Sequence, residues 1–187
     1  MTHPLISFVA FQLCWFACVG GAARGLPWIG PRTVAAFVAA HLWSTPAGRP
    51  RAGQAWLLGL AGLIGYAADS ALVLSGVLRF PPHASLGWPS SAWMVALWVA
   101  QAATLTGAMS WMAGRYLVGA LVGGLSNPFA YLAGARLGAA ILGPSQTAAL
   151  IVVAVEWALA MPLLLWIARQ ASLSSRRVVL ESRTPGS

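Results

Sequence analysis

Two acidic side chains inside apolar segments are the residues of this sequence best suited to chemistry. Asp69 and Glu156 lie in stretches that otherwise have the composition of a lipid-immersed helix, whereas the third acid, Glu181, lies near the C-terminus. A charged side chain at the centre of a bilayer costs about 2.5 to 3.5 kcal/mol on insertion scales, so it indicates a function or a buried partner. A desolvated carboxyl of this kind can hold a proton or act as a general base.

Arg136 is the cation that we expect both acids to meet. With a rise of about 1.5 Å per residue, Asp69 and Arg136 would lie roughly 13 and 9 Å below the outer ends of their helices, and Glu156 roughly 16 Å deep. A guanidinium offers five donors and would offset most of the burial cost of two carboxylates. Two interpretations stay open: a polar cavity open to the outside or a proton site, and a structural ion-pair network that fixes helix register.

Uncharged polar side chains extend this candidate site. Asn127 and Tyr131 lie one helical turn apart, and Pro128 between them removes a backbone donor, so we expect a kink or hinge there. Gln101 and Gln12 each lie on one face of an apolar helix, where such residues form interhelical hydrogen bonds or line cavities. The predicted polar cavity therefore comprises Asp69, Arg136, Glu156, Asn127, Tyr131, Gln101 and Gln12.

The elements that must position these residues are transmembrane helices. The chain has 187 residues, of which 59% are hydrophobic and only 7% are charged; soluble domains carry about 25% charged residues. We predict an all-α, polytopic membrane helix bundle in one domain, residues 1–170, followed by a flexible polar cytoplasmic tail, residues 171–187. A span needs about 20 apolar residues. Six segments are candidates, of which the second is the weakest because it is short: Pro4–Ala22, Pro31–Trp43, Gly53–Leu78, Ser90–Ala113, Tyr116–Leu142 and Ser145–Ala168.

The placement of the arginines predicts how the bundle is oriented. The net charge of +8 would suggest nucleic acid in a soluble protein, but here the cations gather at helix ends, and we expect no nucleic-acid partner. The positive-inside rule favours an even number of spans with both termini cytoplasmic. The cytoplasmic side would then hold Arg49, Arg51, Arg115, Arg169, Arg176, Arg177 and Arg183, and the outer side Arg24, Arg32 and Arg79.

Catalytic and cofactor motifs are missing from the sequence. It has no Walker A motif, no HExxH, no GxSxG and no dinucleotide-binding fingerprint. Cys14 and Cys18, the only cysteines, are expected to be buried apolar side chains, so we predict no metal and no cofactor. Glycine pairs at GxxxG spacing, Gly119 with Gly123 and Gly134 with Gly138, would allow close helix packing or a homodimer.

Several short motifs occur along the chain in a fixed order: Phe11-Gln12, Trp15-Phe16-Ala17, Gly65–Asp69, Trp93, Leu97-Trp98, Asn127-Pro128, Tyr131, Ala133-Gly134, Arg136–Ala139, Glu156–Ala158 and Pro162-Leu163. Together they resemble one family of bacterial inner-membrane proteins, the domain-of-unknown-function 2878 family. The resemblance spans about Pro4 to Ala168, and Asn127-Pro128 stands where a Gly-Pro pair is expected. It implies a location in the bacterial inner membrane. The family has no established activity, but its loose association with neighbours that modify membrane fatty acids implies a lipid substrate or context.

Three functions stay open at this point. The favoured one is binding or transport of a small solute or lipid at an intramembrane polar site hinged at Pro128. The second is a membrane-embedded enzyme, or an accessory subunit, in membrane-lipid modification, with Asp69 or Glu156 as the general base; the missing motifs weigh against independent catalysis. The third is a structural scaffold without a pocket. A cavity would argue against the scaffold, and a lateral opening between helices would favour a lipid over a solute.

Overall fold

Residues 4–45 and 51–181 are described by a computed structural model of the chain, in which side chains are placed up to residue 172. Arg49 and Arg183 of the orientation prediction, and the last six residues of the predicted tail, lie outside these ranges. The described residues form six α-helices: α1 (Pro4–Ala23), α2 (Ile29–Trp43), α3 (Arg51–Leu74), α4 (Ala92–Leu105), α5 (Tyr116–Arg136) and α6 (Gln146–Glu181). The predicted all-α fold is confirmed.

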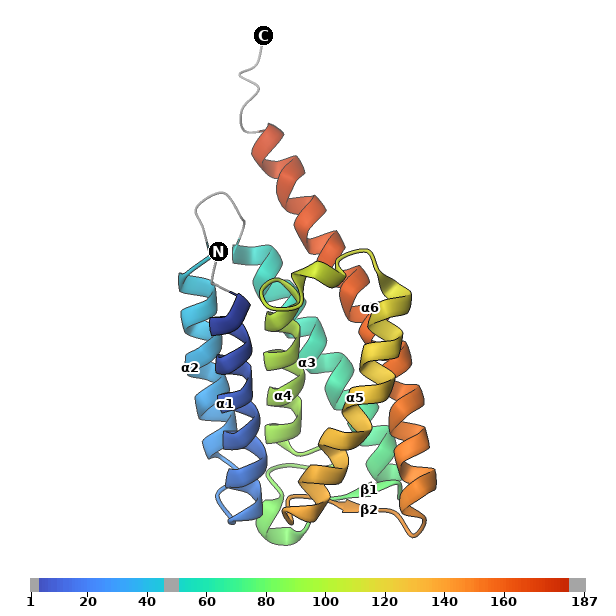
Figure 1. Cartoon of the computed structure of the whole chain (residues 1–187). Helices are drawn as coiled ribbons and strands as arrows, with labels where there is room; N and C mark the ends of the chain where they lie inside the picture. The colour runs from blue at the N-terminus through green and yellow to red at the C-terminus, as the bar shows by residue number, and fades with distance from the viewer. Residues whose placement is uncertain (1–3, 46–50, 182–187) are drawn as a thin grey trace.

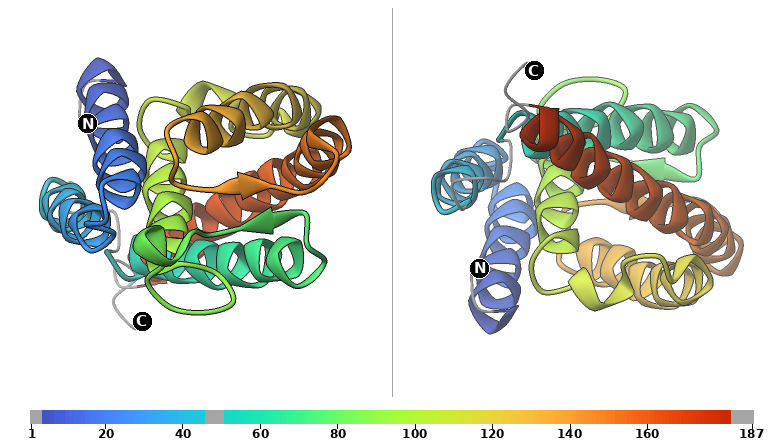
Figure 2. Two further views of the ribbon diagram at one scale, coloured as in Figure 1. Left: turned by 90° about the horizontal axis from the view of Figure 1, so that it is seen from below. Right: turned by 90° about the horizontal axis from the view of Figure 1, so that it is seen from above.

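The helices form one bundle with α4 at its centre. Helix α1 packs against α2 and α4, α3 packs against α4 and α6, and α5 packs mainly against α6. Views along the bundle axis show α4 between the α1–α2 pair on one side and the α5–α6 pair on the other (Figure 2). Helix α1 begins at the same end of the bundle at which α6 finishes (Figure 1).

The opposite end of the bundle is closed by the connections between helices. A two-residue strand after α3, β1 (Leu78–Arg79), pairs antiparallel with β2 (Ile141–Leu142), which lies between α5 and α6. A short 3₁₀ turn, η1 (Pro82–Ala84), follows β1, and its last carbonyl accepts a 2.8 Å hydrogen bond from Nε1 of Trp93 at the start of α4. The β1–β2 pairing ties the α3–α4 connection to the α5–α6 connection, and the Trp93 bond fixes η1 on the start of α4.

Three of the predicted helix ends are wrong. Helix α4 stops at Leu105, and the chain turns through a second 3₁₀ segment, η2 (Ser110–Met112), before α5. Helix α5 stops at Arg136, because Gly138 adopts φ +88° and the amides of Gly138 and Ala139 bond back to the last turn. Helix α6 continues past Ala168 to Glu181, so part of the predicted tail is helical; its flexibility stays a prediction.

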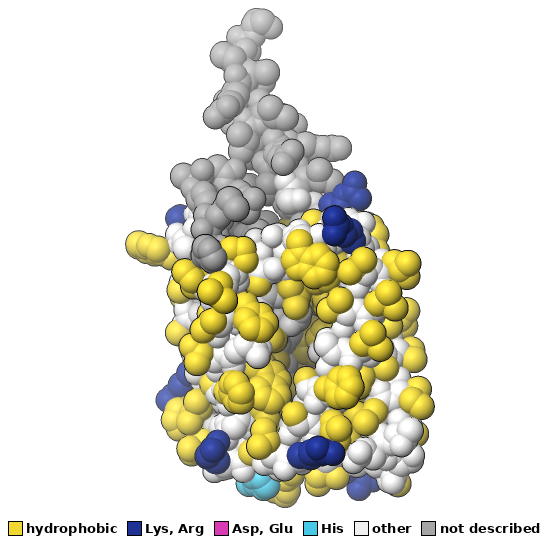
Figure 3. All heavy atoms as spheres, viewed as in Figure 1, with side chains coloured by type: hydrophobic (Ala, Val, Ile, Leu, Met, Phe, Trp, Pro, Cys, Tyr) yellow, Lys and Arg dark blue, Asp and Glu magenta, His cyan; other side chains and the backbone are white. Residues whose placement is uncertain are grey.

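The surface of the bundle is apolar around its middle. Leu13, Leu63, Phe129 and Leu159 each expose more than 60% of their side-chain surface. Hydrophobic side chains cover much of the face seen in Figure 3, with arginines near its two ends. Helices α1, α3, α5 and α6 are each long and apolar enough to cross a membrane. These features are those of a membrane protein.

Helix α4 is shorter than the four long helices, and this bears on the number of spans. Its 14 residues give a length of about 21 Å, against about 30 Å of hydrocarbon in a bilayer. Helix α2 has 15 residues. Six spans with both termini cytoplasmic therefore stay a prediction.

Candidate functional site

Four helices meet around Asp69, whose side chain is fully buried on α3. The hydroxyl of Tyr131 on α5 donates a 2.6 Å hydrogen bond to Oδ1, and the indole Nε1 of Trp98 on α4 donates a 2.8 Å bond to Oδ2. Each carboxylate oxygen thus has its own donor. Hydrogen bonds to a charged group contribute about 1.5 to 3 kcal/mol each, which offsets much of the cost of burying this acid.

A glycine one turn before Asp69 lets Trp98 approach α3. A Cβ atom at Gly65 would lie 2.5 Å from Cδ1 and from Cδ2 of the Trp98 indole, far inside van der Waals contact. The other face of the indole stacks on Trp157 of α6, with ring centroids 4.2 Å apart and an interplanar angle of 20°. Trp98 is therefore held between the backbone of α3 and a second indole, with its N–H directed at Asp69.

Glu156 lies near this cluster but is not part of its hydrogen bonding. Both carboxyl oxygens are buried and make no hydrogen bond within the described chain. The side chain is close enough to Asp69 and Tyr131 to interact with them electrostatically. Nε1 of the neighbouring Trp157 also makes no hydrogen bond. Burial of an unpaired polar group costs free energy, so Glu156 is the least satisfied polar side chain of the bundle interior.

The predicted contact between Arg136 and the two acids is not formed. Arg136 is the last residue of α5 and is exposed. The depth estimate failed because it let the helix run on to Leu142, whereas the turn at Gly138 leaves Arg136 at the end of the bundle. Asp69 is satisfied by two neutral donors instead of a guanidinium.

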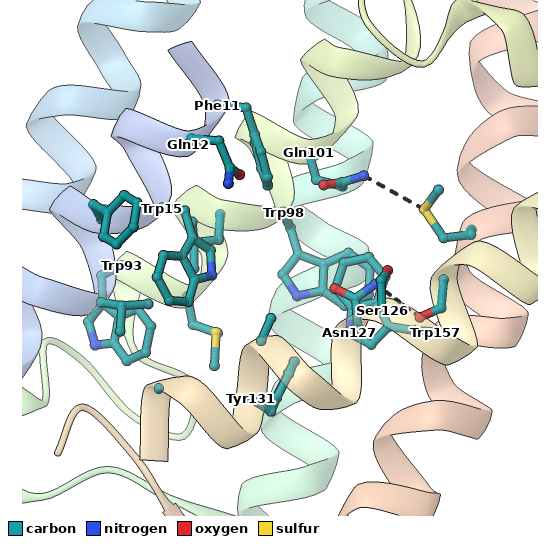
Figure 4. Close-up of a pocket in the computed structure, with 18 of the residues that line it drawn as sticks. Phe11, Gln12, Trp15, Trp93, Trp98, Gln101, Ser126, Asn127, Tyr131 and Trp157 are labelled. Carbon is teal, nitrogen blue, oxygen red and sulfur yellow. Dashed lines mark hydrogen bonds between the residues drawn. The ribbon is translucent and has the colours of Figure 1, made fainter. Parts of the chain in front are cut away.

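Beside the Asp69 cluster lies a cavity of about 400 Å³. Its walls come from α1, α4, α5 and α6, and Tyr131, Trp98 and Trp157 form part of them (Figure 4). Neither Asp69 nor Glu156 reaches the cavity; the carboxylate of Asp69 lies behind the two side chains that it holds. The remaining lining residues are Phe11, Gln12, Trp15, Phe16, Val19, Trp93, Met94, Leu97, Gln101, Met109, Val122, Gly123, Ser126, Asn127, Ala130, Gly134, Ala140 and Met161.

The cavity opens sideways, between α1 and α5. These two helices do not pack along their length, since α1 packs on α2 and α4 while α5 packs on α6. They come close at Val19 and Gly134, where a Cβ on the glycine would lie 3.9 Å from Cγ1 of Val19. Figure 3 shows the resulting hollow in the middle of the molecule, flanked by hydrophobic side chains. Phe16, a lining residue, is 61% exposed.

A bend in α5 shapes this cavity. Pro128 lies inside the helix and supplies no backbone N–H, and Figure 1 shows the second half of α5 turning towards α1. Directly before Pro128, the Ser126 hydroxyl donates to the carbonyl of Val122 (2.6 Å) and Nδ2 of Asn127 donates to that of Gly123 (3.1 Å). Such side-chain bonds to the preceding turn favour bending. The bend carries Tyr131 towards Asp69.

The first half of α5 lies close to α6. A Cβ at Gly123 would lie 2.6 Å from the carbonyl oxygen of Trp157, and one at Gly119 would collide with Leu165. The face of Gly119 and Gly123 is therefore occupied within the chain, and the homodimer stays a prediction.

The sequence profile of a family described as a protein of unknown function, DUF2878, matches residues 4–163. The chain belongs to the DUF2878 family. The resemblance inferred from the motifs is thereby confirmed, and the Asp69 cluster and all the cavity-lining residues lie inside the matched range. No curated protein and no solved structure matches the chain.

Four of the seven polar residues predicted for a site in this DUF2878 chain, namely Gln12, Gln101, Asn127 and Tyr131, line one cavity. Trp98 is not among these seven residues, so its role as a donor to Asp69 was missed. Gly65, four residues before Asp69, indicates that a large side chain approaches α3 at that point. The sequence does not indicate which side chain this is. Within the described residues, no three His, Cys, Asp or Glu side chains gather as a metal site.

Proposed function

We propose that this DUF2878 protein binds a membrane lipid in the cavity between α1 and α5. The observation that carries the proposal is the sideways opening of the cavity, at the level where the surface of the bundle is apolar. A ligand that resides in the bilayer can enter there without crossing a polar surface. Pockets of a few hundred Å³, with apolar walls and a few polar groups, are typical of small-molecule sites.

In this proposal the buried acid positions the wall of the site. Asp69 orients Tyr131 and Trp98, both of which face the cavity, and it makes no contact with the ligand. Acid–base catalysis by Asp69 or Glu156 is not favoured, because neither side chain lines the cavity. A role as an accessory subunit that presents a lipid to an enzyme is compatible with the same site. The location that the family resemblance implies, the bacterial inner membrane, belongs to the proposal.

Retention of lipid by cavity variants tests this function. Ala130→Phe places a ring in the cavity, whereas Ala133→Phe adds the same ring to α5 at a residue that does not line it. The purified proteins are washed in detergent, and the lipid extracted from each is quantified by mass spectrometry. We expect about one tightly held lipid per chain in the wild type and in Ala133→Phe, and loss of it in Ala130→Phe. Equal retention in all three proteins would reject the site.

A further inference from the structure

We infer that the lipid bound in this cavity carries an uncharged, flat head with carbonyl or hydroxyl oxygens, which is the chemistry of an isoprenoid quinone. This inference rests on the proposed lipid-binding function and narrows it to one class of ligand. Three properties of the cavity lead to it: the absence of charge in its walls, the position of its polar groups and the number of its aromatic rings.

The first property is charge. Every residue that lines the cavity is uncharged. The nearest carboxylate, Asp69, lies behind Tyr131 and Trp98 and already accepts a hydrogen bond from each of them. An ionised fatty acid or phosphate in the cavity would therefore lose its hydration without meeting a cation, which is strongly unfavourable. Anionic lipid head groups belong at the ends of the bundle. The exposed arginines Arg24, Arg79 and Arg136 lie at the end that β1 and β2 close.

The second property is the set of polar groups. Among the described residues, the side chain of Gln12 has no hydrogen-bond partner. The amide nitrogen of Gln101, a residue that is 92% buried, has only the sulfurs of Met109 (3.2 Å) and Met161 (3.9 Å) as partners there. Sulfur is a weak acceptor, so the two amides retain hydrogen-bonding capacity for a ligand oxygen. Figure 4 shows them on α1 and α4, on either side of Phe11.

Both amides also lie inside the bundle and not at its surface. Gln12 lies about 12 Å from the start of α1, and the buried Gln101 lies about 6 Å from the end of α4. Phospholipid head groups remain at the bilayer surface, outside the hydrocarbon region. A neutral ring with only a few oxygens can reach amides at this depth at a much lower desolvation cost.

The third property is the aromatic wall. Seven of the 21 lining residues are aromatic, and the indoles of Trp98 and Trp157 are already stacked on each other. Aromatic rings attract other flat rings in offset-stacked or edge-to-face arrangements, beyond the gain from area burial alone. A saturated acyl chain has no face to stack, so these walls favour a planar ligand.

Calorimetric titration of the full-length protein in detergent tests the inference, with decylubiquinone, palmitate and a phosphatidylcholine as the probes. We expect decylubiquinone to bind once per chain in the wild type and in Ala133→Phe, and to lose at least tenfold in affinity in Ala130→Phe. Gln101→Leu removes one neutral hydrogen-bonding group and should weaken binding by about fivefold. The thermal melt of each variant shows whether it is folded. If Ala130→Phe folds poorly, Gln101→Leu serves as the second test of the site.

The outcomes separate the inference from the function on which it rests. Binding of palmitate or phosphatidylcholine that Ala130→Phe abolishes, without binding of decylubiquinone, would overturn the ligand class and leave the lipid site standing. Both proposals are rejected if Ala130→Phe changes the binding of none of the three probes and no lipid is retained on purification. Decylubiquinone binding that neither Ala130→Phe nor Gln101→Leu weakens would place the ligand elsewhere and overturn the inference.

Discussion

Substitution of Gly65 by alanine tests how the buried carboxylate is held. The new Cβ would collide with Cγ of Trp98 and lie 2.5 Å from Cδ1 and Cδ2, whereas ordinary contacts begin near 3.4 Å, so the indole must retreat by more than about 1 Å. The hydrogen bond from Nε1 to Asp69, now 2.8 Å, would then exceed the usual range. The stacked Trp157 opposes this movement, because it occupies the other face of the ring.

The expected cost follows from these two effects. Overpacking costs about 1 to 3 kcal/mol, and a weakened hydrogen bond to a charged group adds about 1.5 to 3 kcal/mol. A loss of about 3 kcal/mol lowers the melting temperature of a chain of this size by about 6 to 12 °C. Tryptophan fluorescence during a thermal ramp of the detergent-solubilised protein measures the shift directly.

Gly59 provides the matched control on the same helix. A Cβ at Gly59 would have no heavy atom within 4 Å. Gly59→Ala should therefore keep or slightly raise the melting temperature, because alanine is favoured over glycine in a helix by about 0.5 to 1 kcal/mol. The reasoning about Gly65 would be refuted if the two alanine variants melted at the same temperature.

Three further predictions concern the charged residues and the topology. Asp69→Asn should destabilise the protein by about 1.5 to 3 kcal/mol, and Arg136→Gln by less than about 0.5 kcal/mol. The double variant should be destabilised by the sum of the two effects. A coupling energy above about 0.5 kcal/mol in thermal melts would reveal an Asp69–Arg136 contact. Glu156→Leu should raise the melting temperature, because it removes an unpaired buried carboxyl; a loss of several degrees would show that Glu156 has a partner. A reporter fused after Ser187 should report a cytoplasmic end, and a periplasmic signal would overturn the six-span topology.

The sequence predicts the helices well and their ends less well. Runs of apolar residues locate α1, α2 and α3 to within a few residues, because turn-forming residues flank these runs. The ends of α4 and α5 depend on turns at Gly107, Gly114 and Gly138. Glycine is so common in these helices that its presence alone does not mark a turn.

The sequence predicts only part of the candidate site, because the errors in the helix ends carry over to the residues placed there. The helical spacing of Gly62, Gly65 and Asp69 indicates a neighbouring helix on that face of α3, and Gly62 and Gly65 both face α4. The choice of partner failed because a charge argument points to an arginine, and an error of six residues in the end of α5 was enough to misplace Arg136. That a tryptophan N–H and a tyrosine hydroxyl satisfy Asp69 is a matter of packing geometry, which spacing along one chain does not determine.

A crystal structure of the protein, from crystals grown in a lipid mesophase, tests the central claim most directly. The account predicts elongated non-protein density that starts beside Gln12 and Gln101 and leaves the bundle between α1 and α5. Closure of that gap by packed side chains, or water alone filling the cavity from an aqueous end of the bundle, would contradict it.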